Sequence, residues 1–124
     1  MAAPNLISPT AINGKSIAVN LTTTSATSIL SNAVSSGKAL KINSLYISNV
    51  NGTSNASITI NYYSAAALGG TATEICSTVI VPANSSLVVI DKNAYIYLEE
   101  NTSIGAIAST ANYLKVLCSY EDIS

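Results

Sequence analysis

The side chains that could perform chemistry in this chain of 124 residues are few, and histidine is absent. Without His, neither a Ser-His-Asp triad nor a Cys-His pair can form, and the common zinc sites lose a ligand. Two cysteines, Cys76 and Cys118, each fall within an expected strand. They either form a disulfide across the core or pack as small buried thiols, and we favour free thiols.

Six carboxylates are the remaining groups that could act as acid, base or cation ligand. Two pairs are adjacent in the chain, Glu99 with Glu100 and Glu121 with Asp122. Neighbours on a strand point to opposite faces of a sheet, so neither pair is a preformed dyad. Calcium takes about six to eight oxygens from a close-spaced loop, and the sequence has no such loop. We therefore expect no catalytic residue, no metal and no cofactor.

All seven aromatic residues are tyrosines, which serve well at subunit interfaces and as stacking platforms for sugars. We expect Tyr62 to point into the core and Tyr63 to point away from it. Tyr95 and Tyr97 share one face of their expected strand. The favoured interpretation places Tyr63, Tyr95 and Tyr97 at an interface. A glycan platform that uses these three residues or Tyr62 is the alternative.

Charge is scarce along the whole chain. Only 9% of the residues are charged, whereas an average soluble domain has about 25%. With a formal net charge of -1, the surface must be covered mainly by Ser, Thr, Asn and Ala. Such a surface favours association, so we expect much of it to be buried between subunits. Arg is absent and the five lysines are scattered, so nucleic-acid binding is not expected.

No segment of the sequence predicts a membrane span or a signal peptide. The apolar runs at residues 65–68 and 87–90 are far shorter than the ~20 residues of a spanning helix. The first residues lack a basic stretch followed by an apolar stretch. We therefore expect no association with a membrane.

The residue pattern is that of strands from end to end. Apolar and polar residues alternate at 16–21, 56–63 and 95–98, with the period of a strand that buries one face. Turn residues separate such segments roughly every eight to twelve residues. The sequence thus predicts an all-β fold, an antiparallel β-sandwich or jelly roll of about eight strands, in one domain over residues 11–124.

One expected strand, residues 39–50, departs from strict alternation. Its apolar residues form two pairs of opposite parity, Leu40 with Ile42 and Leu45 with Ile47. A β-bulge near Asn43 and Ser44 would return all four side chains to the core, so we predict one there.

Residues 1–10 lack alternation and contain two prolines. We predict an extended N-terminal arm that either frays or docks onto a neighbouring subunit. Apolar side chains would be poor choices for a fully solvated tail, so docking stands as an equal alternative to fraying. The interface candidates in this arm are Pro4, Leu6, Ile7 and Pro9.

The strand and turn patterns of nearly the whole chain resemble small virion structural proteins of tailed phages that infect marine cyanobacteria and related bacteria. In the second half the resemblance rests on residues 79–83, 87–93, 96–100, 103–106 and 119–124. In the first half it rests on residues 21–24, 29–33 and 47–53. These are patterns of strands and turns, not catalytic signatures.

The resemblance implies a non-enzymatic virion protein, and we favour a capsid decoration or cement protein that binds and stabilises the head shell. Its partners would be the major capsid protein or other virion proteins, on the capsid surface, after assembly in the host cytoplasm. We also expect a homo-oligomer, with a trimer favoured. The alternative position is the neck, the tail or a fibre, with receptor or glycan binding as a further option there.

Overall fold

The computed structural model describes residues 4–124, which form nine strands. The strands are β1 (Ile12–Asn20), β2 (Thr27–Asn32), β3 (Ala39–Asn49), β4 (Ala56–Ala65), β5 (Gly69–Val81), β6 (Ser86–Ile90), β7 (Ile96–Leu98), β8 (Thr102–Ala108) and β9 (Leu114–Ile123). Within this described part of the chain, no helix is long and apolar enough to cross a membrane.

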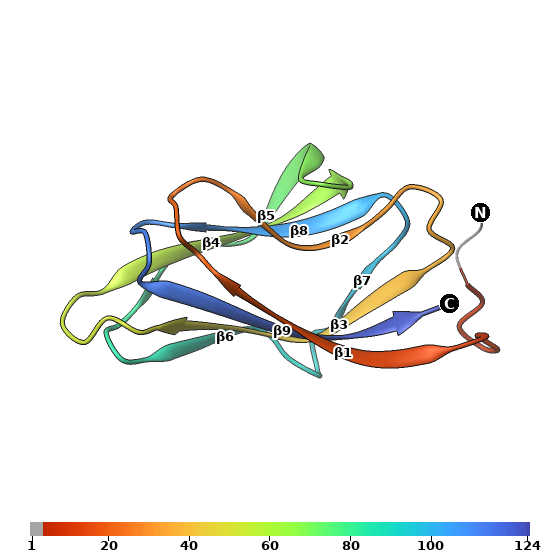
Figure 1. Ribbon diagram of the computed structural model, residues 1–124, viewed down its shortest axis with the longest axis horizontal. Coiled ribbons are helices and arrows are strands. Elements are labelled where there is room, and N and C mark those ends of the chain that lie inside the picture. The colour runs from red at the N-terminus through yellow and green to blue at the C-terminus, as the bar shows by residue number, and fades with distance from the viewer. Residues whose placement is uncertain (1–3) are drawn as a thin grey trace.

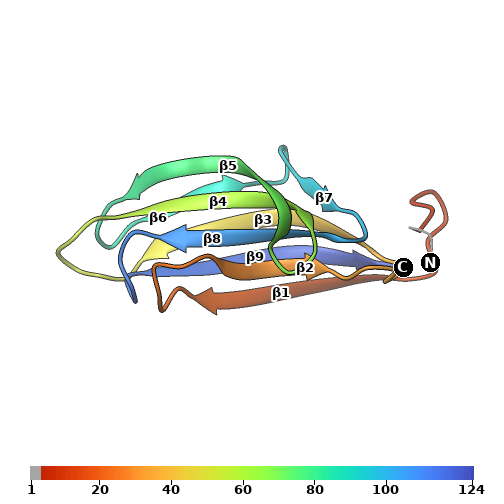
Figure 2. The same cartoon turned by 90° about the horizontal axis from the view of Figure 1, so that it is seen from above.

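The strands form two antiparallel sheets that face each other (Figure 1, Figure 2). Sheet A has the order β1-β9-β3-β6, with β7 also paired to β3, and sheet B has the order β2-β8-β4-β5. Most consecutive strands lie in opposite sheets, which is the connectivity of a jelly roll. The predicted all-β antiparallel sandwich is therefore confirmed, with nine strands where about eight were expected.

One hydrophobic core fills the space between the inner faces of the two sheets. In β4 the alternate residues Ala56, Ile58 and Ile60 are buried, whereas Ser57 and Thr59 between them are partly exposed. The largest side chains with almost no exposure are Leu21, Ile29, Ile42, Leu45, Ile47, Ile58, Ile60, Ile90, Leu98, Ile104 and Leu114. Each such burial contributes about 1.5–3 kcal/mol, so the core is the main source of stability.

β3 is an inner strand of sheet A, and it contains the predicted β-bulge. Its register with β9 shifts between Ile42 and Ser44, which makes Asn43 the extra residue. The apolar residues on both sides of the bulge are all buried: Leu40, Ile42, Leu45 and Ile47. Because β3 pairs with β9, β6 and β7, this bulge sets the side-chain orientation along the middle of sheet A.

The two ends of the domain meet at one end of the sandwich (Figure 1). The backbone N–H groups of Thr10 and Ala11 donate to the carbonyl of Ser124 at 2.7 and 3.1 Å. The Ser124 N–H donates back to the carbonyl of Ala11 at 2.9 Å. The pairing of β1 with β9 is thereby continued by one further step.

The segment before Thr10 is not extended where the structure describes it, which differs from the arm expected from the sequence. The Asn5 side chain accepts the Ile7 N–H at 2.9 Å, and the Asn5 carbonyl accepts the Ser8 N–H at 3.2 Å. An asparagine that bonds the backbone two residues later folds the chain into a turn. Residues 1–3 of the predicted arm lie outside the described residues.

Deletion of Asn43 should remove the bulge and turn two buried apolar side chains of β3 toward solvent. We expect a loss of roughly 3–6 kcal/mol in the free energy of unfolding, at about 1.5–3 kcal/mol for each side chain. Asn43→Ala keeps the residue count and loses only the hydrogen bond to Glu121, so it should cost about 1 kcal/mol. Urea unfolding followed by far-UV circular dichroism measures both losses. Equal losses would contradict the role of the bulge.

Candidate functional site

The outer face of sheet A, turned away from sheet B, carries side chains in rows that run across the strands. One row consists of Ala18, Leu117, Tyr46 and Val88, because each of these residues pairs with the next one across the sheet. We call these four the apolar row. Tyr46 is 41% exposed, Leu117 46% and Val88 52%. Contiguous exposed apolar side chains of this kind mark sites of interaction.

A shallow hollow of about 430 Å³ lies beside the apolar row. Its polar lining is a second row across the same four strands: Asn20, Lys115, Ser48 and Ser86. Lys115 is the only charged residue of this lining. The hollow therefore combines an apolar side with hydroxyl and amide groups and a single cation.

A third row, which we call the charged row, lies nearer the chain ends and consists of Gly14, Glu121, Lys41 and Tyr97. The Lys41 ammonium lies 3.8 Å from a carboxylate oxygen of Glu121 and 4.4 Å from the ring centroid of Tyr95. The rings of Tyr95 and Tyr97 meet edge to face, with centroids 5.6 Å apart. Tyr97, within this row, and Tyr95, in the turn before β7, were both predicted at an interface, and both are exposed.

Tyr63, which the sequence placed at an interface with Tyr95 and Tyr97, lies on sheet B and is only 8% exposed. Its own chain covers it. Gly105 leaves the space for this cover, since a Cβ there would lie 2.6 Å from Leu68 and 3.2 Å from the Tyr63 ring. Tyr62, expected in the core, packs against the core and is partly buried.

The cover over Tyr63 is the β4–β5 connection, which folds back onto the outer side of sheet B. Three of its backbone N–H groups donate to side chains of sheet B and the β7–β8 turn at 2.9–3.0 Å. The pairs are Ala66 with Asn101, Ala67 with Ser31, and Leu68 with Ser103. All three acceptors are far from the connection in the chain, so the alternation of β4 could not reveal this fold-back.

The segment of residues 4–10, which contains the predicted interface residues of the arm, lies at the end of the molecule where the chain ends meet (Figure 1). Ile7 is 94% exposed and Leu6 is about half exposed, while Pro4 and Pro9 are partly buried. None of these four lies in the three rows of sheet A. The arm and the outer face are therefore separate candidate contacts.

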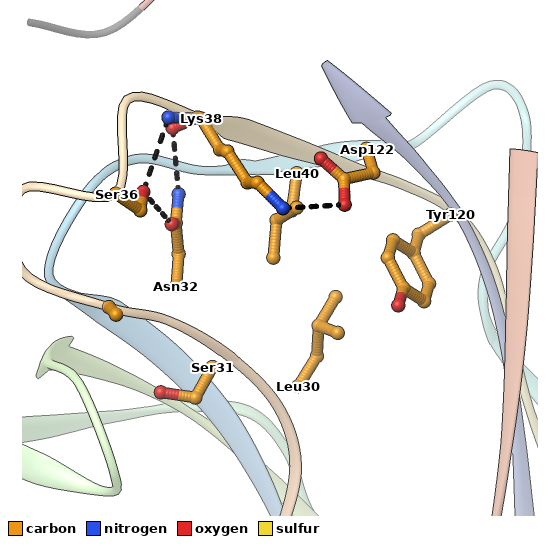
Figure 3. Close-up of a pocket in the computed structure, with 9 residues that line it drawn as sticks. Leu30, Ser31, Asn32, Ser36, Lys38, Leu40, Tyr120 and Asp122 are labelled. Atoms are coloured by element: carbon orange, nitrogen blue, oxygen red, sulfur yellow. Dashed lines mark hydrogen bonds and ion pairs between the residues drawn. The ribbon is translucent and has the colours of Figure 1, made fainter. Parts of the chain in front are cut away.

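A pocket of about 240 Å³ opens between the sheets near the same end (Figure 3). Asp122, only 6% exposed, lies at this pocket, and Leu30, Leu40 and Tyr120 form its apolar side. The Asp122 carboxylate accepts hydrogen bonds from the ammonium groups of Lys15 at 2.9 Å and Lys38 at 3.1 Å. This ion-paired cluster connects β1, β9 and the β2–β3 connection, and sequence reasoning missed it.

The charges of this cluster are mutually stabilised. Burial raises the pKa of Asp122, but the hydrogen bonds from Lys15 and Lys38 outweigh it and hold the pKa below its ordinary 3.8. The hydrogen bond to Asp122 raises the pKa of Lys15 above its ordinary 10.5. Because Asp122 and Lys15 keep their charges near neutral pH, the cluster is suited to holding strands together rather than to transferring protons.

The amide of Asn32, at the rim of the same pocket, is also used by the chain itself (Figure 3). Its nitrogen donates to the carbonyls of Lys38 and Leu98, both at 2.9 Å, and its oxygen accepts the Ser36 hydroxyl. A buried amide with both donors and its acceptor satisfied has little capacity left for a ligand. The pocket rim is therefore structural.

The two thiols form no disulfide, and the adjacent carboxylates Glu121 and Asp122 do not share a site. Cys76 and Cys118 are free, and burial raises the pKa of both, that of Cys118 to about 12. Since the thiolate is the reactive form, neither thiol is activated.

Glu121 contacts Lys41 on the outer face while Asp122 lies inside, so these neighbours point to opposite faces as predicted. Among residues 4–124, no three His, Cys, Asp or Glu side chains group as a metal site.

Asp122→Asn should lower stability by about 1 kcal/mol near pH 7, because it removes a buried carboxylate from two partly exposed lysines. A depressed carboxyl pKa gives stability that is present above 3.8 and is lost as the pH falls through the folded-state pKa. The difference between variant and parent should therefore shrink in acid. Thermal unfolding at pH 7 and pH 3 measures it, with Glu74→Gln, an exposed carboxylate on β5, as the control. A difference that is the same at both pH values would contradict the ion-pair account.

Comparisons with known proteins establish the fold and leave the family open. No protein-family model matches the chain, and no curated protein matches it. A solved chain from Bacillus endospore appendages, described as a family of disulfide-linked pili, shares the fold with a TM-score of 0.52. The likeness covers 91% of this chain and 88% of the other, at 17% sequence identity. The chain therefore shares its fold with a protein of these appendages, while the resemblance to small virion proteins stays a prediction.

Proposed function

We propose that this chain is a non-enzymatic structural subunit of a phage particle, in the first place a capsid decoration or cement protein that binds and stabilises the head shell. The observation that carries the proposal is the outer face of sheet A, where an exposed apolar row crosses four of the five strands. A subunit that functions only in contact with neighbouring subunits can have such a face, which is exposed only in the isolated chain.

The groups that could have served chemistry support a structural role. Asp122 is ion-paired to two lysines, and Asn32 has its amide satisfied by backbone and Ser36. Neither cysteine is activated, since burial raises the pKa of both thiols. These side chains stabilise the domain, and the exposed surface is left to binding. The partners would be the major capsid protein or other virion proteins, on particles assembled in the host cytoplasm.

The arm would supply the contact with the shell. Leu6 and Ile7 project at the end of the sandwich, and Ile7 is almost fully exposed. The turn at Asn5 holds these two apolar side chains together in a short, compact segment. Burial of one such side chain against the shell is worth about 1.5–3 kcal/mol, or at least about tenfold in affinity.

A second candidate places the same subunit in the neck, the tail or a fibre. The likeness to a protein of disulfide-linked pili favours it, since that protein builds a filament. The exposed pair Tyr95 and Tyr97 would then be available for receptor or glycan contact.

Copy number in purified particles of the phage that encodes the chain separates these positions. Quantitative mass spectrometry against the major capsid protein should give about one copy, or a simple fraction, per capsid subunit for a decoration protein. A few to some dozens of copies per particle would place the chain in the neck, tail or fibres. Absence from the particles would overturn the structural role in both forms.

Removal of residues 1–8 should weaken binding to undecorated heads by about tenfold or more while the melting temperature stays unchanged. The backbone bonds of Thr10 and Ala11 with Ser124 are kept in this variant, so the sandwich stays closed. The double substitution Leu6→Ser with Ile7→Ser should act in the same way. Val34→Ser, at an exposed apolar residue of the β2–β3 connection, is the matched control. Unchanged head binding by both arm variants would exclude the arm as the anchor.

A further inference from the structure

β9 and β3 are the two inner strands of sheet A, so the line between them divides its outer face into two halves. β1 lies beyond β9, while β6 and β7 lie beyond β3. A two-fold axis along this line would place each β9 residue opposite the β3 residue of the same row in a second copy. It would likewise place β1 residues opposite those of β6 or β7. The strand register therefore shows directly whether the face is complementary to itself.

The charged row is self-complementary under this operation. Glu121 of one copy falls opposite Lys41 of the other, and the reverse, so two ion pairs form across the axis. Gly14 falls opposite Tyr97. A Cβ at Gly14 would have nothing within 4 Å, so an open position faces an exposed phenol ring. No two like charges of this row meet.

The apolar row also matches itself. Leu117 falls opposite Tyr46, and Ala18, the smallest member, falls opposite Val88. Two sheets pack about 10 Å apart when their facing side chains interdigitate, with strand directions within about 30° of each other. Small residues opposite large ones are what such interdigitation needs.

The hollow beside the apolar row then receives a side chain of the second copy. Lys115 falls opposite Ser48, and Asn20 falls opposite Ser86. The aliphatic part of Lys115 can cover Tyr46 while its ammonium reaches the hydroxyl and amide oxygens of the lining. Each copy would fill the hollow of the other, and the two Lys115 charges stay apart.

A two-fold axis at right angles to this one, along the apolar row, gives a poorer match. It would stack the apolar row on itself, with Tyr46 against Tyr46, and place Lys115 opposite Ser119. The charged row would lie beyond the contact, with Glu121 and Lys41 facing no counterpart. The two-fold axis parallel to the strands is therefore favoured, because it pairs opposite charges and places small residues opposite large ones.

The area of the face suits a reversible contact. Four strands about 4.8 Å apart, followed over six residues at about 3.3 Å each, project an area of roughly 400 Å². The accessible area is larger than this projected area because side chains protrude from the sheet. It still stays below the ~800 Å² per partner of a standard interface. We expect a dimer with a dissociation constant in the micromolar range.

We propose that two copies of this chain pair through the outer faces of sheet A, about a two-fold axis that runs parallel to the strands between β9 and β3. This pairing rests on the proposed structural role and names one partner and its register. It replaces the trimer favoured from the sequence with a two-fold contact.

Sedimentation velocity on charge-reversed chains tests the register. Lys41→Glu and Glu121→Lys should each weaken pairing by at least about tenfold, because each puts like charges opposite one another. An equimolar mixture of the two variants should pair about as well as the parent. In the mixed pair the introduced glutamate faces the introduced lysine, and the native Glu121 faces the native Lys41. Mixing cannot repair the repulsion within each chain, so recovery isolates the contact between chains.

Two further variants separate pairing from folding. Gly14→Leu should leave the melting temperature unchanged or raise it, since the site is open and glycine weakens a strand, yet weaken pairing about tenfold. Leu117→Lys should abolish pairing. Ile80→Lys, the same change at an exposed residue of β5, should leave it unaffected.

A parent chain that stays monomeric at several hundred micromolar, a trimeric mass, or a mixture of variants that fails to pair would each overturn the proposal. These outcomes are distinct from failure of the proposed function. A monomer present in many copies on the particle would keep the structural role and exclude the pairing. A dimer absent from particles would do the reverse.

Discussion

The β-bulge at Asn43 determines what each face of sheet A presents. Lys41 and Tyr46 are five residues apart and would point to opposite sides of a regular strand, yet both lie on the outer face. The inserted residue reverses the alternation between them and, by the same step, keeps the apolar residues on either side in the core. The same bulge therefore determines both which side chains of β3 enter the core and which lie in the outer rows. An inserted residue reverses the orientation of the side chains on both faces of a strand at once.

The stability of the domain comes from its core, and its surface carries unusually few charges. The inner faces of both sheets supply one continuous apolar cluster, and buried amides secure the connections around it. Asn49 donates to the carbonyls of Ser54 and Val81 and accepts the N–H of Asn51, much as Asn32 does near the chain ends. Such bonds hold the loops with neutral side chains, which is consistent with a surface that carries few charges.

The sequence predicts local geometry well and long-range arrangement poorly. Alternation was sufficient for the strands, the inward face of β4 and the bulge, since each depends on residues close in the chain. Tyr63 was predicted at a subunit interface, because alternation cannot show that the β4–β5 connection folds back over it. Asp122 and its lysines are separated by 84 and 107 residues, so their contact depends on which strands and connections lie side by side in the fold. The rows of sheet A depend in the same way on the register of all five strands of that sheet.

The bonds between Ala11 and Ser124 have a consequence for the connectivity of the domain. They bring the first and last residues of the domain into direct backbone contact. This contact lies at the end of the sandwich opposite the turn at residues 51–55 (Figure 1). A linker of a few residues could therefore close the domain into a ring without moving a strand. The ring could be reopened in that turn, and each strand pair would survive in the permuted chain. The strand pairing of the domain therefore does not require the chain to begin at β1 and end at β9.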